Sequence, residues 1–461
     1  MKKDYPETEE FFTEDTAKGS NTSHTLQTQT DVPKKTSVFW KRFLIVGLAF
    51  VAFGAGYLAS DLQYDSELKT LKRIKNHIQS HYFEEVKDEE FYGVLFDAVN
   101  DKVLDKYSKY MNPDEYQSVL SSATGEWSGL GLTFLTEDSQ GNKQLLVQRV
   151  AGNSPAEAVG AKEGDYVIGY GMDENSITPC EDYDEFYSFV QEIEKDKNFL
   201  LKIRRDGREL TLEICKKTFV ENYVFYRSST TAFSFTGKDG TTLTERGEPL
   251  TALDNETAYI RLTQFNGSAG KEFKTAMSKF KAEGKTNLVL DLRGNGGGYM
   301  DILQEISSYF CKGESGSSLV AVAKYNKGQK ENFYSKSSYY ADYFTENSKI
   351  KVLADVSTAS ASECLIGCML DYGAIAYADI CLSERGGLAK TYGKGIMQTT
   401  YPFGLLGKVD AIKLTTAQIY WPKSENCIHG RGILPEDGTK TVIENYEKDV
   451  EISLAIAKLF A

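Results

Sequence analysis

Residues 287–298, NLVLDLRGNGGG, constrain the fold of this chain more than any other stretch. The first six residues are almost continuously apolar, as are strands that are buried on both faces of a parallel sheet. A glycine-rich turn follows directly, and the residues after it, MDILQEISSYF, have a helical pattern. Upstream, the pattern predicts a strand over residues 258–265 and a helix over residues 269–282. This alternation of strands and helices predicts an α/β core.

A second stretch, residues 357–398, carries side chains that could perform chemistry. Two small, flexible pieces, TASAS and TYGKG, enclose one apolar run. The first piece offers serine hydroxyls, and the second offers the amine of Lys394. A hydroxyl, an amine and a loop of accessible backbone N–H groups are the parts that acyl transfer needs. The sequence therefore indicates acyl-transfer chemistry.

The four histidines of the chain limit which form of this chemistry is available. His24, His77 and His81 precede the predicted catalytic fold, so a Ser-His-Asp triad would have to use His429, in the turn-like segment CIHGRGILPED. A lysine can replace histidine if its amine is neutral, which requires lowering its pKa by roughly three units, about 4 kcal/mol, mainly through burial. Lys394 has no charged residue beside it and suits that role; the alternative is an ordinary solvated lysine.

Four motifs together resemble those of a known family. DLRGNGGG, STASASE, TYGKGIMQ and CIHGRGILPED, in this order, are similar to motifs of the carboxy-terminal processing peptidases, the tail-specific serine–lysine proteases of family S41. The likeness covers roughly residues 61–440. It implies a multi-domain α/β protein with a PDZ domain and a serine-protease core of the tail-specific type. It also implies a serine endopeptidase that needs no metal or organic cofactor.

The resemblance assigns roles to individual residues. It implies that Ser360, rather than Ser362, is the nucleophile, that Lys394 is the general base, and that Gln398 supports the lysine. The oxyanion hole would consist of two backbone N–H groups, one from Ala361 and one from the glycine run, with Gly297 favoured. Losing one such donor typically costs about 2.7–4 kcal/mol of transition-state stabilisation.

One segment departs from the family pattern. Between Tyr377 and Thr391 the chain has ADICLSERGGLAK, which is longer than the usual connection in the family. Surface loops tolerate insertions at low entropic cost, so we expect a surface bulge ahead of Lys394. The same insertion leaves open an alternative of another class, a membrane-tethered PDZ scaffold that binds protein C-termini and has an inactive protease core.

Composition excludes some other classes of function. The chain has 53 basic and 66 acidic residues, a net charge of −13, which argues against nucleic acid as a partner. Seven cysteines are scattered without a close CxxC pair, so neither a zinc site nor a disulfide framework is indicated. The residues weighed for zinc are Cys364, Cys368, Cys381, Cys427 and His429.

The N-terminal region predicts attachment to a membrane. Residues 1–37 have the composition of a disordered cytoplasmic tail, and residues 38–60 are expected to form a transmembrane signal anchor around an apolar run over 43–59. Basic residues before this run place the N-terminus in the cytoplasm and the catalytic domain outside the cell membrane. A cleaved signal peptide is the competing interpretation.

The rest of the chain divides into three predicted parts. Residues 61–123 are expected to be helical, either as a plain spacer or, as in the family, as a homodimer contact. Residues 124–218 are expected to form the PDZ domain, which includes a hairpin with an Asp206-Gly207 turn. Residues 219–461 are expected to form the protease core, with a Ser/Thr/Gly-rich linker over about 227–250 and a last helix from about residue 440.

The predicted PDZ domain supplies the substrate-recognition element. Its GLGL loop, Gly129, Leu130, Gly131 and Leu132, is expected to capture a chain terminus with successive N–H groups while the peptide adds a strand. The substrates would be extracytoplasmic proteins or peptides with apolar C-termini. The sequence therefore predicts a single-pass membrane serine endopeptidase with a serine–lysine dyad.

Overall fold

The structure is a computed structural model that describes residues 65–137, 141–180, 182–236, 242–245, 247–404, 409–443 and 448–461. The chain divides into two compact units, Met1–Tyr92 and Gly93–Ala461. In the first unit, helix α2 (Ser66–His81) is followed by the start of helix α3 (Asp88–Lys102), and Lys75 forms an ion pair with Asp88 at 2.8 Å.

Within the described ranges, no helix is both long and apolar enough to cross a membrane. The predicted tail and membrane segment, residues 1–60, lie outside those ranges. The helical prediction for residues 61–123 is correct for α2, α3 and α4 (Pro113–Thr124). It misses the short strand β1 (Lys109–Met111), which pairs with a strand about 300 residues further along the chain.

A six-stranded sheet occupies much of the N-terminal part of the second unit, with strand order β3-β4-β5-β7-β8 and β6 paired to β5. The predicted hairpin is confirmed, since Asp206 and Gly207 form the turn between its last two strands, both with positive φ. Strand β3 lies at the sheet edge. The elements are β3 (Leu132–Glu137), β4 (Lys143–Val150), α5 (Pro155–Ala158), β5 (Tyr166–Gly171), β6 (Thr178–Pro179), α6 (Tyr183–Glu192), β7 (Asn198–Arg205) and β8 (Arg208–Cys215). Strands β2 (Glu126–Gly129) and β9 (Lys217–Val220) pair with each other.

The largest sheet has eight strands in the order β12-β11-β10-β13-β14-β17-β18-β21. The five strands from β13 onward are parallel, as the alternation of strands and helices predicts. The strands are β10 (Val224–Arg227), β11 (Ala232–Thr236), β12 (Thr242–Glu245), β13 (Thr257–Leu262), β14 (Asn287–Asp291), β17 (Ile350–Asp355), β18 (Ile380–Glu384) and β21 (Lys440–Ile443).

Two predictions at the ends of this sheet are wrong. The expected linker over 227–250 contains β11 and β12, because Phe235 is buried and threonine-rich segments suit strands. The expected last helix from residue 440 begins instead with strand β21, which has β-branched Thr441, Val442 and Ile443, and the helix α11 (Lys448–Phe460) follows.

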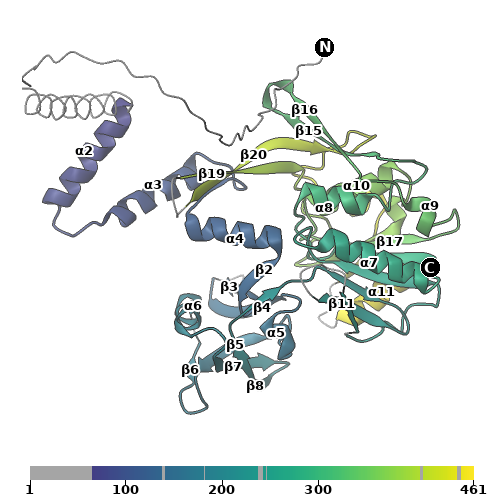
Figure 1. The fold of residues 1–461 in the computed structure, drawn as a ribbon, viewed down its shortest axis with the longest axis horizontal. Helices are drawn as coiled ribbons and strands as arrows, with labels where there is room; N and C mark the ends of the chain where they lie inside the picture. Colours follow the sequence, from purple (N-terminus) through teal and green to yellow (C-terminus); the bar gives the residue numbers. More distant parts are fainter. Residues whose placement is uncertain are drawn as a thin grey trace, which may run out of the picture. The chain divides into compact units, whose positions relative to one another are not determined.

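Alternate residues of the parallel strands pack on opposite faces of the sheet. Ile260, Leu290 and Ala354 belong to one hydrophobic cluster with helices α7 (Ala269–Ala282), α8 (Met300–Ser307) and α10 (Ala361–Asp371). Tyr259, Val289 and Leu353 belong to another cluster with α11. The sheet is therefore covered by helices on both faces, and α7, α8 and α10 lie next to one another (Figure 1).

A smaller antiparallel sheet completes the second unit. Its strand order is β1-β20-β15-β16, with β19 paired along β20. These strands are β15 (Leu319–Tyr325), β16 (Lys330–Tyr334), β19 (Ile396–Phe403) and β20 (Asp410–Tyr420), and the short elements are η1 (Asn326–Gly328), α9 (Tyr340–Tyr343), η2 (Tyr377–Asp379) and η3 (Pro435–Asp437). Through β1, residues just after α3 lie against β20.

The segment expected to bulge ahead of Lys394 has two different parts. Its first part is the buried parallel strand β18, which lies inside the large sheet. Its second part is a tight turn in which Arg385 and Leu388 form an isolated bridge around the exposed glycines Gly386 and Gly387. Only this turn lies at the surface, so the bulge is smaller than expected and precedes TYGKG.

Candidate active site

A cavity of about 500 Å³ brings the predicted catalytic residues together. It lies where the N-terminus of α10 meets the glycine turn after β14 and the start of β19. Its lining includes Ser360, Ala361, Gly297, Lys394 and Gln398. Residues separated by up to about 100 positions in the sequence therefore surround one space.

The backbone around Ser360 is strained. Ser360 lies between β17 and α10 with φ +58° and ψ −115°, a conformation that a residue with a side chain rarely adopts. It lines the cavity, whereas Ser362 is fully buried and donates its hydroxyl to the carbonyl oxygen of Asn295 at 3.0 Å. Of these two serines, Ser360 is therefore the one that a substrate in the cavity could meet.

The glycine turn packs directly on the backbone at Ser360. At Gly297, φ is +99°, and a Cβ atom added there would lie 2.8 Å from Ser360 Cβ and 2.9 Å from Ala361 N. The N–H of Gly297 donates to Asn295 Oδ1 at 2.9 Å. The N–H groups of Ala361 and Gly298 donate to no acceptor among the described residues. Two backbone donors near the serine thus remain available.

The buried ion pair before this turn has a structural role. Arg293 donates to both oxygens of Asp291, at 2.9 and 2.6 Å, and also pairs with Glu451 on α11 at 2.5 Å. Burial alone would raise the pKa of Asp291, but the Arg293 guanidinium outweighs it and lowers the pKa below its ordinary value. The pair connects the sheet to α11 and leaves neither group free for proton transfer.

Lys394 has the environment that a lysine base requires. Its side chain is half-buried, and its ammonium group makes no ion pair or hydrogen bond with a described residue. Burial lowers the pKa of Lys394, the positive charge of Lys413 lowers it further, and Glu363 opposes the shift. Burial and a neighbouring cation are two known ways of keeping a lysine amine neutral near pH 7.

The CIHGRGILPED segment packs against the backbone on both sides of Lys394. A Cβ added at Gly393 would lie 2.8 Å from Gly432 N, and one added at Gly395 would lie 2.8 Å from His429 N. Only glycines permit this close approach. His429 itself is exposed, and the residues that line the cavity include its neighbour Ile428 but not His429.

Glu363 connects the two proposed catalytic segments. Its carboxylate is fully buried and accepts a hydrogen bond from the backbone N–H of Ser360 at 3.0 Å and from that of Lys394 at 2.9 Å. It also accepts from Gly393 N at 2.7 Å and from the hydroxyl of Thr391 at 2.6 Å. One side chain therefore fixes the backbone of the serine and the lysine relative to each other.

Gln398 lies in the cavity wall. Among the described residues it forms no hydrogen bond with Lys394, which it was expected to support. Its amide donates instead to the backbone carbonyl oxygen of Tyr107. The ring of Tyr107 lies 5.7 Å from Lys394 Nζ. Gln398 thus contacts the segment that covers the lysine.

The cysteine and histidine residues weighed for zinc are not gathered into a metal site. The described parts of the chain contain no cluster of three or more His, Cys, Asp or Glu side chains suited to a metal ion. Cys368 is buried in α10, with its Sγ 3.9 Å from that of Cys311. The described cysteines are free thiols.

A second cavity, of about 430 Å³, lies beside the edge strand β3. The GLGL loop connects β2, which ends at Gly129, with β3, which begins at Leu132. Residues of α6, among them Phe186 and Val190, also line the cavity. All four residues of the predicted peptide-binding loop, Gly129, Leu130, Gly131 and Leu132, contact this cavity.

Sequence reasoning missed four residues of the active-site region. Glu363 had a usable signal, because Ser360-x-x-Glu363 has the spacing of a capping box at a helix start. Asn295 lies within the glycine motif but has no separate signal. Tyr107 and Lys413 come from distant parts of the chain, and nothing local in the sequence connects them with Lys394.

The chain is similar to known serine proteases over most of its length. The chain is 26% identical over 395 residues to a probable CtpA-like serine protease of Staphylococcus saprophyticus, covering 84% of this chain and 69% of the relative. A probable CtpA-like serine protease of Staphylococcus haemolyticus is 26% identical over 399 residues, covering 86% and 69%. Among solved structures, the photosystem II D1 C-terminal processing protease has a TM-score of 0.45 and 20% identity over 82% of this chain and 87% of that one.

The family comparison covers most of the residues that line the cavity. Residues 256–437 match Peptidase family S41, and this range includes Ser360 and Lys394. The relatives and the family match together identify the chain as a serine-type peptidase that contains a Peptidase family S41 domain.

Proposed function

We propose that this peptidase is an endopeptidase that uses a dyad of Ser360 and Lys394. The hydroxyl of Ser360 attacks the scissile carbonyl, and the neutral amine of Lys394 takes the hydroxyl proton and later returns it to the leaving amine. The observation that carries this proposal is the cavity shared by the strained serine and a half-buried lysine without an ion-pair partner.

Backbone N–H groups stabilise the oxyanion in this proposal. Ala361 supplies one donor, because its N–H has no acceptor among the described residues and follows the nucleophile directly. The second donor is Gly297 if its bond to Asn295 opens when substrate binds, and Gly298 if that bond persists. Preorganised donors of this kind need no rearrangement as charge develops.

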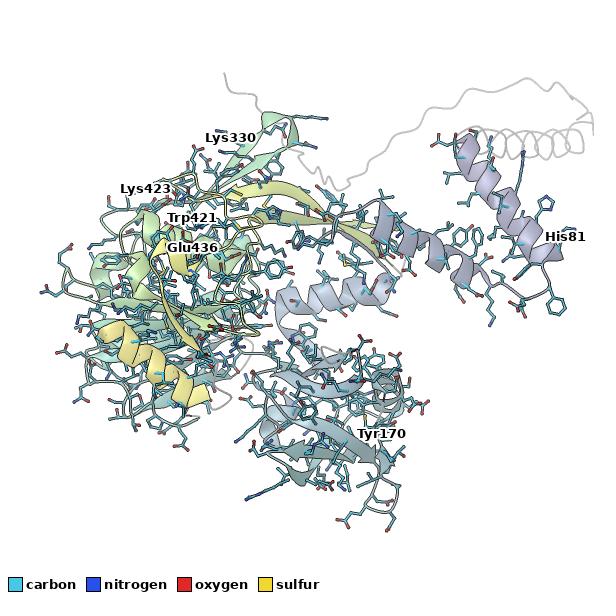
Figure 2. All side chains as sticks on the ribbon, turned by 180° about the vertical axis from the view of Figure 1, so that it is seen from behind. His81, Tyr170, Lys330, Trp421, Lys423 and Glu436 are labelled. Carbon is cyan, nitrogen blue, oxygen red and sulfur yellow. The ribbon has the colours of Figure 1, made fainter. Side chains whose placement is uncertain are left out.

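The cavity also favours an apolar side chain next to the scissile bond. Ile396, Ile419, Trp421 and Ile428 line it. Trp421, labelled in Figure 2, packs so closely on α10 that a Cβ added at Gly367 would lie 2.2 Å from its ring. These four side chains are uncharged, so this wall excludes water from one side of the site; the charged residues that line the cavity are Lys394 and Lys413.

Active-site labelling tests the dyad against its alternatives. A fluorophosphonate probe should label the wild type and the Ser362→Ala variant but neither Ser360→Ala nor Lys394→Met. An unlabelled, correctly folded wild type would favour the inactive scaffold. If His429→Ala lost labelling and Lys394→Met kept it, the base would be His429 and the dyad would be wrong.

We further propose that residues 124–218 form a PDZ domain that binds apolar C-termini of protein substrates. The cavity between edge strand β3 and α6, closed by the GLGL loop, supports strand addition by a peptide with its terminus at the loop. A labelled peptide with an apolar, free C-terminus should bind, and the same peptide with an amidated C-terminus should bind at least tenfold more weakly. Equal binding of the two would contradict the proposal.

The membrane anchor over residues 38–60, with an extracytoplasmic catalytic domain, is also a proposal, supported by the apolar run and the basic residues before it. Its test is extraction of membranes with carbonate, followed by protease digestion of intact cells. A homodimer through the helical region stays a prediction that sedimentation of the full chain can check.

A further inference from the structure

The segment just before β1 covers the proposed base. Tyr107 presents its ring 5.7 Å from Lys394 Nζ, although 287 positions separate the two residues in the sequence. The backbone carbonyl of Tyr107 accepts the amide proton of Gln398, which lines the cavity. Tyr107 is thus tied to the active site through its ring and through its backbone.

Other contacts hold this segment in place. The carboxylate of Asp105 accepts hydrogen bonds from Tyr107 N at 3.0 Å and from Ser108 N at 2.7 Å, which fixes a tight turn. The Ser108 hydroxyl accepts from Thr415 N on β20 at 2.8 Å. The chain then continues as β1, which pairs with β20. Tyr107 is therefore part of an anchored turn rather than a free loop.

Charged and titratable groups reach this region from several elements. Lys413 on β20 and Glu363 on α10 act on Lys394 electrostatically. Lys106 lies over the rings of both Tyr107, at 4.8 Å, and Tyr392, at 5.5 Å. The ring of His429 lies 5.9 Å from that of Tyr107. Each of these groups is retained in the variants compared below.

Two effects of the Tyr107 ring on Lys394 have opposite signs. The face of an aromatic ring attracts a cation, which favours the charged lysine, but this attraction fades at about 6 Å. The ring also takes the place of water beside the amine, which disfavours the charged form. At 5.7 Å the attraction is near its limit, so exclusion of water is the larger effect.

We propose that Tyr107 is a positioning residue of this peptidase, whose ring shields the amine of Lys394 from water and whose backbone holds Gln398. The proposal rests on the dyad of Ser360 and Lys394. It assigns a role in catalysis to a residue that lies well before the family match at residues 256–437.

The test is the pH profile of kcat/KM for the full chain, whose acid limb reports the pKa of the base in the free enzyme. Tyr107→Ala should move the midpoint of that limb to higher pH by roughly one unit. On the limb its kcat/KM should then be about tenfold below that of the wild type, and at alkaline pH the two values should be equal. Tyr107→Phe and Tyr107→Leu should keep the wild-type midpoint because both retain bulk. Tyr401→Ala, an exposed tyrosine on β19, is the matched control.

The outcomes separate this inference from the proposed function. A midpoint in Tyr107→Ala that is unchanged would overturn the shielding role. A lower midpoint in both Tyr107→Ala and Tyr107→Leu would overturn it in favour of cation attraction. Should Lys394→Met remain fully active, the dyad itself fails. If Lys394→Met is inactive but the midpoint of Tyr107→Ala is unchanged, the shielding role of Tyr107 is wrong and the dyad still stands. Thermal unfolding of each variant verifies that it is folded. If the alanine variant does not fold, a lower midpoint in Tyr107→Leu alone still overturns the shielding role.

Discussion

Replacing Glu363 tests whether a single carboxylate fixes the backbones of Ser360 and Lys394 relative to each other. Oε2 accepts from the backbone N–H groups of Ser360 and Lys394, and Oε1 accepts from Gly393 N and the Thr391 hydroxyl. Burial raises the pKa of Glu363, and these donors oppose that rise. The carboxylate therefore has enough acceptor capacity for all four donors, which an amide or a methyl group lacks.

The structure gives different magnitudes for two substitutions. Glu363→Ala leaves three backbone N–H groups without an acceptor, that of Gly393 buried and those of Ser360 and Lys394 half-buried. At about 1–3 kcal/mol for each group the expected loss of folding free energy is at most about 3–9 kcal/mol. Glu363→Gln can place its oxygen at the Oε2 position and its NH₂ group toward the Thr391 hydroxyl, which can accept. Of the three backbone N–H groups only that of Gly393 then loses its partner, while the Thr391 hydroxyl, which donates to Glu363, has to rotate, so the expected loss is about 1–3 kcal/mol.

The expected activities follow from the same bonds. Glu363→Gln keeps the bonds to Ser360 and Lys394, so labelling by a fluorophosphonate probe should slow by less than about tenfold. Glu363→Ala frees both backbones, and misplacement of reacting groups by about 1 Å costs about 100-fold. Urea denaturation measures the stabilities, and labelling is compared at a temperature at which both variants are folded. If Glu363→Gln is folded but as inactive as Glu363→Ala, the negative charge acts in the chemistry and the positioning role is refuted.

Three further predictions concern neighbouring groups. The positive charge of Lys413 helps to lower the pKa of Lys394. Lys413→Met should therefore move the acid limb of kcat/KM to higher pH, whereas Lys413→Arg should leave it in place. An unchanged limb in the methionine variant would contradict this electrostatic role. Arg293→Met should cost about 3–5 kcal/mol in urea denaturation, because it leaves Asp291 buried without its partner. The lowered pKa of Asp291 means that its contribution is present above about pH 3.9 and is lost as pH falls below that value, so the difference between Arg293→Met and wild type should shrink in acid. Gly297→Ala should abolish labelling because its Cβ would lie 2.8 Å from Ser360 Cβ, whereas Gly296→Ala meets no atom within 4 Å and should still be labelled; wild-type labelling of Gly297→Ala would show that the packing is not needed.

The sequence predicted the parts of the fold that local patterns determine. The strand in NLVLDL and the helix over residues 269–282 appear as β14 and α7, because apolar runs and helical periodicity fix them locally. Strands β11 and β12 were mistaken for a linker since their Ser and Thr residues suit turns as well as strands. Their pairing with β10 settles the choice, and that pairing is a tertiary contact.

The candidate site was predictable to the same extent. Ser360 and Lys394 stand in recognisable motifs, and the uncharged neighbours of the lysine correctly indicated burial. The family resemblance favours Gly297 as an oxyanion donor, but it does not show that the N–H of Gly297 is bonded to Asn295. The resemblance also implies that Gln398 supports the lysine, whereas the amide of Gln398 donates to the backbone carbonyl oxygen of Tyr107. Side-chain and backbone partners of this kind depend on atomic positions, which motif spacing does not supply.

The environment of the proposed base, Lys394, therefore depends on the whole second unit rather than on TYGKG alone. The amine belongs to residue 394, but the groups that act on its charge come from Tyr107 before β1, Glu363 on α10 and Lys413 on β20. These elements meet only after β1 has paired with β20 and α10 has packed on the large sheet. A lysine that must be neutral to act is consequently competent only in the folded unit. Displacing the segment at residues 105–111 should therefore raise the pKa of Lys394 and lower activity on the acid limb of kcat/KM, while leaving Ser360 and the backbone N–H groups beside it in place.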